Sequence, residues 1–438
     1  MKKLVSTLLE NRILELLANP SFLYFTLSVF CSQVAFNMLN IVLIFLIFSL
    51  TNSNFAVAVL LLTVLIPQIL LSFLGGVVAD KHNKKRILII GNFLRAVVLF
   101  ILFFNFKSPA IVYIVTLLIS GITQFYVPAE SPLIPMLVKR DKLVAANSIF
   151  GISLFGSILI GYVLAGPVVS ALGRSNVFLL LSAVFAAAGL FASFIREKHV
   201  KEHAVDEDVE MYERSIMVEF KSSFSILAKT KKVADAFFLL IFSQIVIFIL
   251  ATLIPGYAKD ILQIPAEDLS LVIFAPAAIG MILAGVGMGS VFHKTKKEKL
   301  TSYGVFISGF ALMLLPFTSK ILARGFIITL NSMLPHTFML TVFNFVILIA
   351  FSAGFANALI FIPSQAVIQE TIPEDFRSKI YGLLFALIGV FSLLPVTIAG
   401  ALSDLIGVGT VFFSIGLLIV ILGFLRNRFV IRVPKRFH

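Results

Sequence analysis

The chain has 438 residues, of which 59% are hydrophobic and only 13% charged, and its formal net charge at pH 7 is +13. About a quarter of the residues of soluble globular proteins are charged, so this composition and a mean hydropathy of +1.06 exclude an ordinary soluble protein. The apolar residues form long runs without strand alternation, which excludes an outer-membrane barrel and predicts an all-α membrane protein.

The N-terminal segment, residues 1–20, is polar enough to lie outside the membrane. It carries Glu10, Arg12 and Glu15, and no short apolar core precedes a small-residue cleavage site. We therefore expect an amphipathic cytoplasmic helix ending at Pro20 rather than a signal peptide. Cys31, the single cysteine, lies in the first apolar run and is interpreted as a packing residue.

About twelve apolar runs are long enough to cross a bilayer, at roughly 20 residues each. The polar stretch 196–232 separates six from six, and its mixed charges predict a cytoplasmic linker. Segment 321–339 is apolar but broken by Arg324 and Pro335, and we expect it to lie at the outer interface. The predicted spans are 22–50, 54–79, 87–106, 110–133, 145–172, 175–195, 234–257, 267–292, 300–318, 339–366, 379–405 and 409–427. The predicted domains are the segment 1–20, a six-helix bundle at 21–195, the linker 196–232, a second six-helix bundle at 233–427 and a basic cytoplasmic tail at 428–438.

Alternate loops differ in their content of cations. One set holds the run from Lys81 to Arg86, then Lys139, Arg140 and Lys142, then Lys294 to Lys299, and the other set holds few. Cytoplasmic loops of membrane proteins are enriched in Lys and Arg. We therefore expect both termini in the cytoplasm and an even number of spans. The protein should be a multi-pass protein of the plasma (inner) membrane. Its cations should contact membrane lipids rather than nucleic acid.

The two halves of the chain repeat each other. Ser32-Gln33 recurs as Ser243-Gln244, the segment 127–130 recurs as 362–365, and Ala165-Gly166 recurs as Ala399-Gly400. The loop from Gly75 to Arg86 has an altered copy from Gly289 to Lys299, with His293 in the place of Asp80. Four similarities in matching order predict a transporter built from two related halves.

Polar side chains inside the membrane are costly and usually face a cavity or one another. Gln33, Asn37 and Asn40 lie at i, i+4 and i+7, which places them on one helical face. They line a cavity or make interhelical hydrogen bonds in a packed interface. Phe248 and Ala251 occupy the repeat-related positions after Gln244, so we expect a polar N-terminal side and an apolar C-terminal side of the cavity. The other candidate substrate-binding residues are Gln68, Arg95, Gln124, Tyr126, Gln244 and Asn357.

Arg95 is the most unusual of these residues, because it lies roughly 12 Å into the third span. A charge at this depth requires a carboxylate, a phosphate or water. Glu130, near the cytoplasmic end of the fourth span, is the obvious carboxylate. A structural ion pair between the two and a role in binding substrate or protons are both open.

Several motifs are absent from the sequence. It has no Gly-x-x-x-x-Gly-Lys-Ser/Thr phosphate loop, no cluster with metal-ligand spacing and no Gly-x-Ser-x-Gly motif. We therefore expect no ATP-driven pump, no enzyme, no cofactor and no metal site.

The loop between the second and third spans resembles the signature of the major facilitator superfamily. The matching residues are Gly76, Ala79, Asp80, Lys81, Lys84, Lys85 and Arg86. Asn83 stands where the family usually has glycine, and asparagine tolerates a left-handed backbone better than most residues. The segments 125–129, 133–135, 146–148 and 165–167 are similar to the branch holding macrolide efflux proteins, enterobactin exporters and lysophospholipid transporters.

This resemblance implies twelve helices in two bundles, a central cavity and rocking between inward-open and outward-open states. It also implies that the Asp80 loop acts as a cytoplasmic latch against the eleventh helix near Ile380. We expect an exporter of amphipathic drugs or natural products, with protons as the candidate coupling ion and Glu130 as the titrating group. The alternatives are a lysophospholipid flippase with Arg95 at the head group, and a non-transporting receptor or scaffold. We expect the protein to be a monomer.

Overall fold

The computed structural model describes residues 15–139, 142–196, 230–292, 295–318, 341–372 and 374–431, without the side chains of Phe73, Asp80, 374–379 and 428–431. Within these ranges the chain is helical and contains no β-strand. The predicted N-terminal helix lies largely outside the described residues, as do the linker, segment 321–339 and His293.

The described residues of the first half of the chain form five helices, of which the last is much longer than one span. They are α2 (Pro20–Thr51), α3 (Asn54–Lys81), α4 (Lys84–Asn105), α5 (Pro109–Leu137) and α6 (Leu143–Ser193). The 51 residues of α6 are interrupted at Gly173, whose φ of 78° and ψ of 163° are not helical. Glycine adopts a positive φ without steric cost, so α6 comprises two spans that meet where the sequence predicts a boundary.

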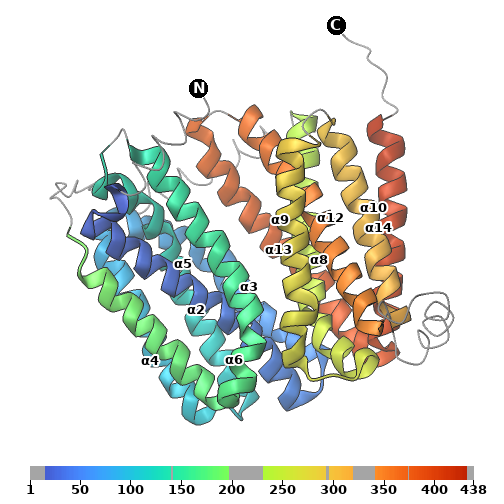
Figure 1. Ribbon diagram of the computed structural model, residues 1–438, viewed down its shortest axis with the longest axis horizontal. Helices are drawn as coiled ribbons and strands as arrows, with labels where there is room; N and C mark the ends of the chain where they lie inside the picture. Colours follow the sequence, from blue (N-terminus) through green and yellow to red (C-terminus); the bar gives the residue numbers. More distant parts are fainter. Residues whose placement is uncertain are drawn as a thin grey trace, which may run out of the picture. The chain divides into compact units, whose positions relative to one another are not determined.

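The second half is interrupted by short helical turns (Figure 1). Its described elements are α8 (Lys231–Tyr257), η2 (Ala258–Leu262), η3 (Ala266–Asp268), η4 (Ser270–Phe274), α9 (Ala275–Ser290), α10 (Lys297–Leu314), η5 (Leu315–Thr318), α12 (Val342–Thr371), α13 (Glu374–Ile406) and α14 (Val408–Ile431). The span predicted over 267–292 corresponds to Ala266–Ser290, which begins with a 3₁₀ turn and a π turn before α9. Pro276 at the start of α9 has no N–H to donate, which accounts for irregular backbone there.

The described residues contain eleven helices that are long and apolar enough to cross a membrane. Counting α6 as two gives the twelve predicted spans. The chain divides into two compact units, Met1–Thr51 with Leu60–Glu207, and Asn52–Val59 with Asp208–His438. The first residues of α3 thus belong to the second unit and the remainder of α3 to the first.

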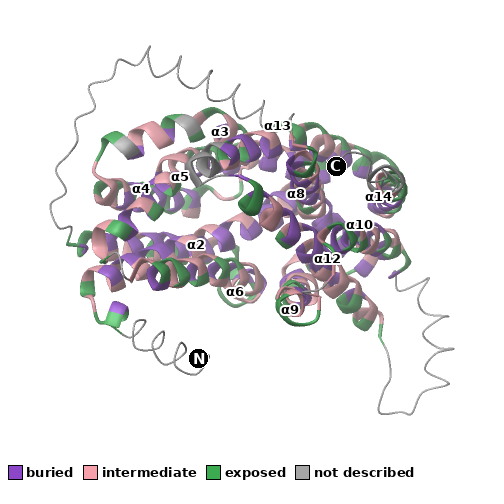
Figure 2. Ribbon diagram, turned by 90° about the horizontal axis from the view of Figure 1, so that it is seen from above, coloured by how far each residue is buried: buried purple, intermediate pink, exposed green. Residues whose placement is uncertain are grey.

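Burial is unevenly distributed over the helices (Figure 2). The helix α2 is buried along most of its length, whereas other helices expose large apolar side chains such as Leu70, Phe104 and Leu405. Exposed leucine and phenylalanine on long helices are what a hydrocarbon environment favours. The protein is therefore a multi-pass membrane protein.

The loop between α3 and α4 consists of His82 and Asn83. Asn83 has an extended backbone, with φ of −63° and ψ of 114°, so it does not adopt the left-handed conformation that asparagine would tolerate here. Its side chain instead accepts a hydrogen bond of 2.9 Å from the backbone N–H of Arg86. Asn83 therefore acts as the N-cap of α4, a position that asparagine favours.

The glycine pair at the end of α3 has one packed member. A Cβ atom on Gly75 would lie 1.9 Å from the backbone oxygen of Gln124 in α5, whereas a Cβ atom on Gly76 would meet nothing within 4 Å. Only Gly75 therefore permits close approach of two helices. Within the second unit, α10 and α14 run side by side and α12 packs against α9 (Figure 1).

Candidate functional site

Arg95 is the largest fully buried side chain in the described residues and lies on the inner face of α4, with 1% of its surface exposed. Its Nη1 donates a hydrogen bond of 3.0 Å to Ser32 Oγ on α2. The centre of the guanidinium lies 4.1 Å from the ring centroid of Tyr126 and 5.5 Å from that of Phe185. These cation–π contacts stabilise the charge within the helix bundle.

The guanidinium of Arg95 nevertheless has donors to spare. Its Nε and Nη2 atoms, and Oδ1 of the nearby Asn92, are buried without a hydrogen-bond partner. Buried polar atoms without partners are rare in native proteins, and each requires an explanation such as a bound ligand or water. Asn92 lies three residues before Arg95, so the two side chains share one face of α4. The arrangement is that of a planar fork able to hold an anionic group.

We call the side chains that meet around Arg95 the Arg95 cluster; they are Ser32, Gln33, Asn92, Arg95, Tyr126, Glu130 and Phe185. Glu130 on α5 is its second buried ionisable group and is 3% exposed. The side-chain amide of Gln33 donates to both of its carboxylate oxygens, at 3.1 Å and 3.3 Å. Among the described residues no nitrogen of Arg95 lies within ion-pair distance of this carboxylate. A direct structural pair between Arg95 and Glu130 is therefore not formed, and a neutral amide takes the place of the cation.

The other predicted polar residues of the first half of the chain differ in their contacts. Asn37 is buried and donates to the backbone oxygen of Gln33 at 2.8 Å, so its amide is used within its own helix. Asn40 is half-buried. In α5, Gln124 donates to the backbone oxygen of Ser120, and the hydroxyl of Tyr126 accepts a long contact of 3.5 Å from Asn92. Gln68 is half-buried beside Pro67 in α3.

The second unit repeats part of this pattern without charges. Ser243 on α8, the counterpart of Ser32, accepts a hydrogen bond of 2.8 Å from Asn357 on α12. Gln365, the counterpart of Glu130, accepts one of 2.5 Å from the hydroxyl of Tyr381 on α13. Gln244 is half-buried. The repeated positions are therefore polar in both units, but the ionisable pair of buried groups occurs in the first.

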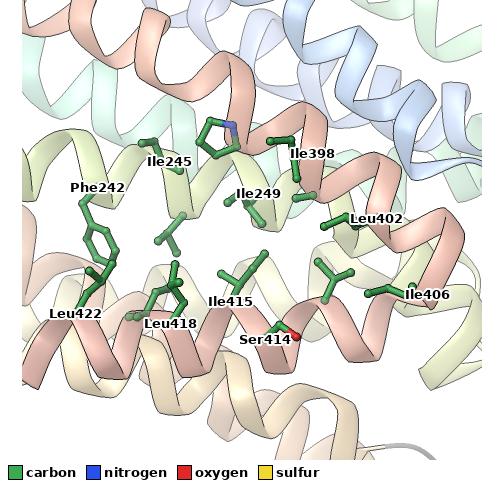
Figure 3. Close-up of a pocket in the computed structure, with 15 residues that line it drawn as sticks. Phe242, Ile245, Ile249, Ile398, Leu402, Ile406, Ser414, Ile415, Leu418 and Leu422 are labelled. Atoms are coloured by element: carbon green, nitrogen blue, oxygen red, sulfur yellow. The ribbon is translucent and has the colours of Figure 1, made fainter.

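An apolar groove runs between α8, α13 and α14 in the second unit (Figure 3). Its volume is about 340 Å³. The side chains that line it are aliphatic apart from Phe242, Pro395 and Ser414, and the figure shows Ser414 as the hydroxyl at one side. Apart from this hydroxyl the lining offers no polar side chain to orient a head group, so the groove fits hydrocarbon.

The basic loop lies mostly at the surface. Lys81 and Arg86 are exposed, and Lys84 and Lys85 are half-buried. The side chain of Asp80 lies outside the described residues, as do those of the segment preceding Ile380, so the latch stays a prediction. The described residues contain no group of three or more His, Cys, Asp or Glu side chains that could hold a metal ion.

Three residues of the cluster were not predicted from the sequence. Ser32, Asn92 and Phe185 all contact Arg95 or share its helical face. The repetition of Ser32 as Ser243 was a signal for the first, and the three-residue spacing from Arg95 was a signal for the second. Nothing in the sequence indicates Phe185, because one phenylalanine among 46 is not distinctive.

Comparison with known proteins gives a family and several relatives. Residues 25–338 match the model of the Major Facilitator Superfamily. The uncharacterized MFS-type transporter YfiS of Bacillus subtilis (strain 168) is 23% identical over 380 residues, covering 86% of this chain and 85% of that protein. Macrolide efflux protein A of Streptococcus pyogenes is 22% identical over 403 residues, covering 89% of this chain and 91% of that protein.

Solved structures share the fold at lower identity. The nucleoside transporter NupG aligns with a TM-score of 0.69 at 15% identity, covering 92% of this chain and 98% of that one. The POT family transporter PepTSo aligns with a TM-score of 0.69 at 12% identity, covering 95% and 99%. At such identities the likeness extends to the fold alone.

Proposed function

The chain belongs to the major facilitator superfamily and is a membrane transporter rather than an enzyme, and from this premise we propose that it exports amphipathic drugs or natural products by alternating access, in exchange for protons. The observation that carries the proposal is Glu130, a buried carboxyl group whose side-chain partner is the amide of Gln33. The similarity to a macrolide efflux protein supports the substrate class and the direction.

The partner of Glu130 suits a group that changes its protonation state. An amide can donate to a carboxylate through its nitrogen or accept from a carboxylic acid through its oxygen. Gln33 can therefore hold Glu130 in both forms, which an arginine or lysine could not do. A carboxyl group that is enclosed in one conformation and hydrated in another exchanges its proton with the aqueous phase, which is the requirement for coupling.

We expect Glu130→Gln to remove the response of transport to a pH gradient. In proteoliposomes loaded with a fluorescent macrolide, the wild type should move substrate faster when the gradient is imposed, whereas the variant should move it at one rate with and without the gradient. Glu298→Gln is the control, because Glu298 is an exposed acid on α10. If Glu130→Gln responds to the gradient as the wild type does, proton coupling through this residue is wrong.

A second candidate function rests on the unpartnered donors of Arg95. Phosphate accepts several hydrogen bonds in a planar, bidentate arrangement, so Arg95 could meet the head group of a lysophospholipid. The apolar groove of the second unit offers hydrocarbon surface but lies among α8, α13 and α14, and it is not part of the Arg95 cluster. Lysolipid movement is therefore the alternative to drug export.

The alternative predicts a strong dependence of lysolipid movement on the shape of the side chain at 95. Arg95→Ala should stop translocation of a fluorescent lysophospholipid in vesicles, and Arg95→Lys should restore it only in part, because lysine cannot present the fork. Ser32→Ala is the matched control, since it removes the protein's own hydrogen bond to the guanidinium but leaves its charge. Unchanged lysolipid movement in Arg95→Ala contradicts the phosphate interpretation.

The remaining elements of the proposal concern location and conformation. We place both termini in the cytoplasm and the protein in the plasma membrane, on the asymmetry of the cations between alternate loops. The loop from Gly76 to Arg86 would then lie on the cytoplasmic side and act there as the latch that closes the transporter. The partners of the protein are membrane lipids, a small amphipathic substrate and protons, and we propose that it works as a monomer.

A further inference from the structure

The first turn of α3 is held by a carboxylate from another helix. This carboxylate is that of Asp404, which lies in the last turn of α13, 350 residues after Asn54. Its Oδ1 accepts from the backbone N–H of Asn54 at 2.8 Å, and its Oδ2 accepts from the backbone N–H of Phe55 at 3.1 Å and from Ser53 Oγ at 2.5 Å. All of these residues belong to the second compact unit.

These contacts satisfy the start of the helix completely. The first four N–H groups of a helix have no partner within the helix. Asp404 accepts from the first two, Ser53 Oγ accepts from Ala56 at 3.1 Å, and the backbone oxygen of Ser53 accepts from Val57 at 3.4 Å. A negative charge at this position also interacts favourably with the helix dipole. Half of the cap is therefore supplied by a different helix.

The turn that precedes α3 is fitted to the end of α8 as well. The side chain of Asn54 is 3% exposed and accepts from the backbone N–H of Gly256 at 3.2 Å. Asn52, in the left-handed region with φ of 51°, accepts from Lys259 Nζ at 3.0 Å. A Cβ atom on Gly256 would lie 2.4 Å from Asn54 Nδ2, and one on Gly400 would lie 2.9 Å from the Asn54 backbone oxygen. Glycine at both positions gives the start of α3 its space.

We propose that Asp404 is a conformational latch that holds the start of α3 in one state of the transport cycle and releases it in another. The inference rests on alternating access. Residues Asn52–Val59 lie in the second unit and α3 continues from Leu60 in the first, so a movement that separates the units must either bend α3 or break the Asp404 cap. Asp404 and Phe55 are exposed, so water can replace the cap as it opens.

The strength of the latch is suited to this use. Removing an N-cap shifts a helix equilibrium about 2- to 30-fold, which biases the populations of two conformers without trapping either. In the orientation proposed from the loop charges, the start of α3 lies on the external side of the membrane, opposite the cytoplasmic Gly76–Arg86 loop. Asp404, near the C-terminus of α13, and Asp80, near the C-terminus of α3, would then act as latches on opposite sides of the membrane.

The test uses a labelling readout that does not depend on the substrate. Val57 is fully buried in the first turn of α3, so in a Cys31→Ser background Val57→Cys should react with a membrane-impermeant maleimide only when the first turn of α3 moves away from Asp404 and α13. Asp404→Ala should raise the labelling rate about 2- to 30-fold. Asp260→Ala, which removes another exposed acid, is the control and should leave the rate unchanged.

Each outcome decides the proposal. A rate in Asp404→Ala equal to that of the parent, or no labelling in any variant, overturns the latch. Should Asp404→Ala fail to fold, the isosteric Asp404→Asn is measured, and an unchanged rate in that folded variant overturns the latch too. A raised rate in a protein that moves no macrolide keeps the latch and rejects the proposed substrate class.

Discussion

Gly354→Ala is expected to destabilise the protein by about 3 kcal/mol or more, at the upper end of the range for overpacked sites. Gly354 lies where α12 crosses α9, and a Cβ atom on it would be 1.9 Å from the backbone oxygen of Ala277. On the opposite side of the same crossing, a Cβ atom on Gly280 would be 2.1 Å from the backbone oxygen of Phe351. The obstructing atoms are backbone, which cannot rotate away as a side chain can, so the helices must separate.

The measurement is the thermal unfolding of purified protein in detergent, followed by the loss of its monodisperse peak in size-exclusion chromatography. Close approach of helices through small residues is a principal source of stability in membranes, so loss of this crossing should lower the apparent Tm markedly. Gly289→Ala in the same helix α9 is the control, because a Cβ atom there would meet nothing within 4 Å. An equal apparent Tm for the two variants contradicts the prediction.

Asp235→Ala should be the second most damaging substitution, with an expected cost of about 3 kcal/mol. Asp235 on α8 makes a bidentate ion pair with Arg426 on α14, at 3.0 Å and 2.7 Å. The guanidinium also donates to Ser302 and Thr301 on α10, and its side chain is only 10% exposed. Without the carboxylate this charge remains enclosed and unpaired. We take the low end of the range for buried pairs because Asp235 is 30% exposed.

The double variant Asp235→Ala with Arg426→Leu separates the interaction from its parts. If the unpaired charge causes the loss, removing Arg426 as well should recover most of the stability, and the double-mutant cycle should give a clear coupling energy. Glu370→Ala is the matched control, since the Lys297–Glu370 pair is 35% and 68% exposed and should contribute less than about 1 kcal/mol. Equal losses in Asp235→Ala and Glu370→Ala contradict the account.

The positions of the helices follow from the sequence because the bilayer leaves the chain few options. Every backbone polar group in hydrocarbon must be paired within its own segment, so a long apolar run is a helix whatever its neighbours are. For this reason α2, α3, α8 and α14 begin and end within a few residues of the predicted spans. The break in α6 was predictable too, because Gly173 can adopt a φ that other residues avoid.

The pairing of polar side chains depended on the tertiary structure. The sequence offered Glu130 as the partner of Arg95, but the partner of the carboxylate is Gln33, and Arg95 donates instead to Ser32. Whether Glu130 or Ser32 contacts Arg95 depends on the rotation of each helix about its axis. Successive residues point 100° apart around a helix, and a helix that is apolar on every side gives no indication of which face points inward. The same uncertainty separates Gly75, which is packed, from Gly76, which is not.

The sequence by itself predicted a membrane protein of about twelve spans with two related halves, and an arginine and a glutamate within the spans, because hydropathy and repetition can be read directly from the order of residues. Only the tertiary structure decided how Asp404 is used. A carboxylate at the end of one helix and the open N–H groups at the start of another are each unremarkable in sequence. They meet across some 350 residues, and that proximity depends on how the whole chain packs.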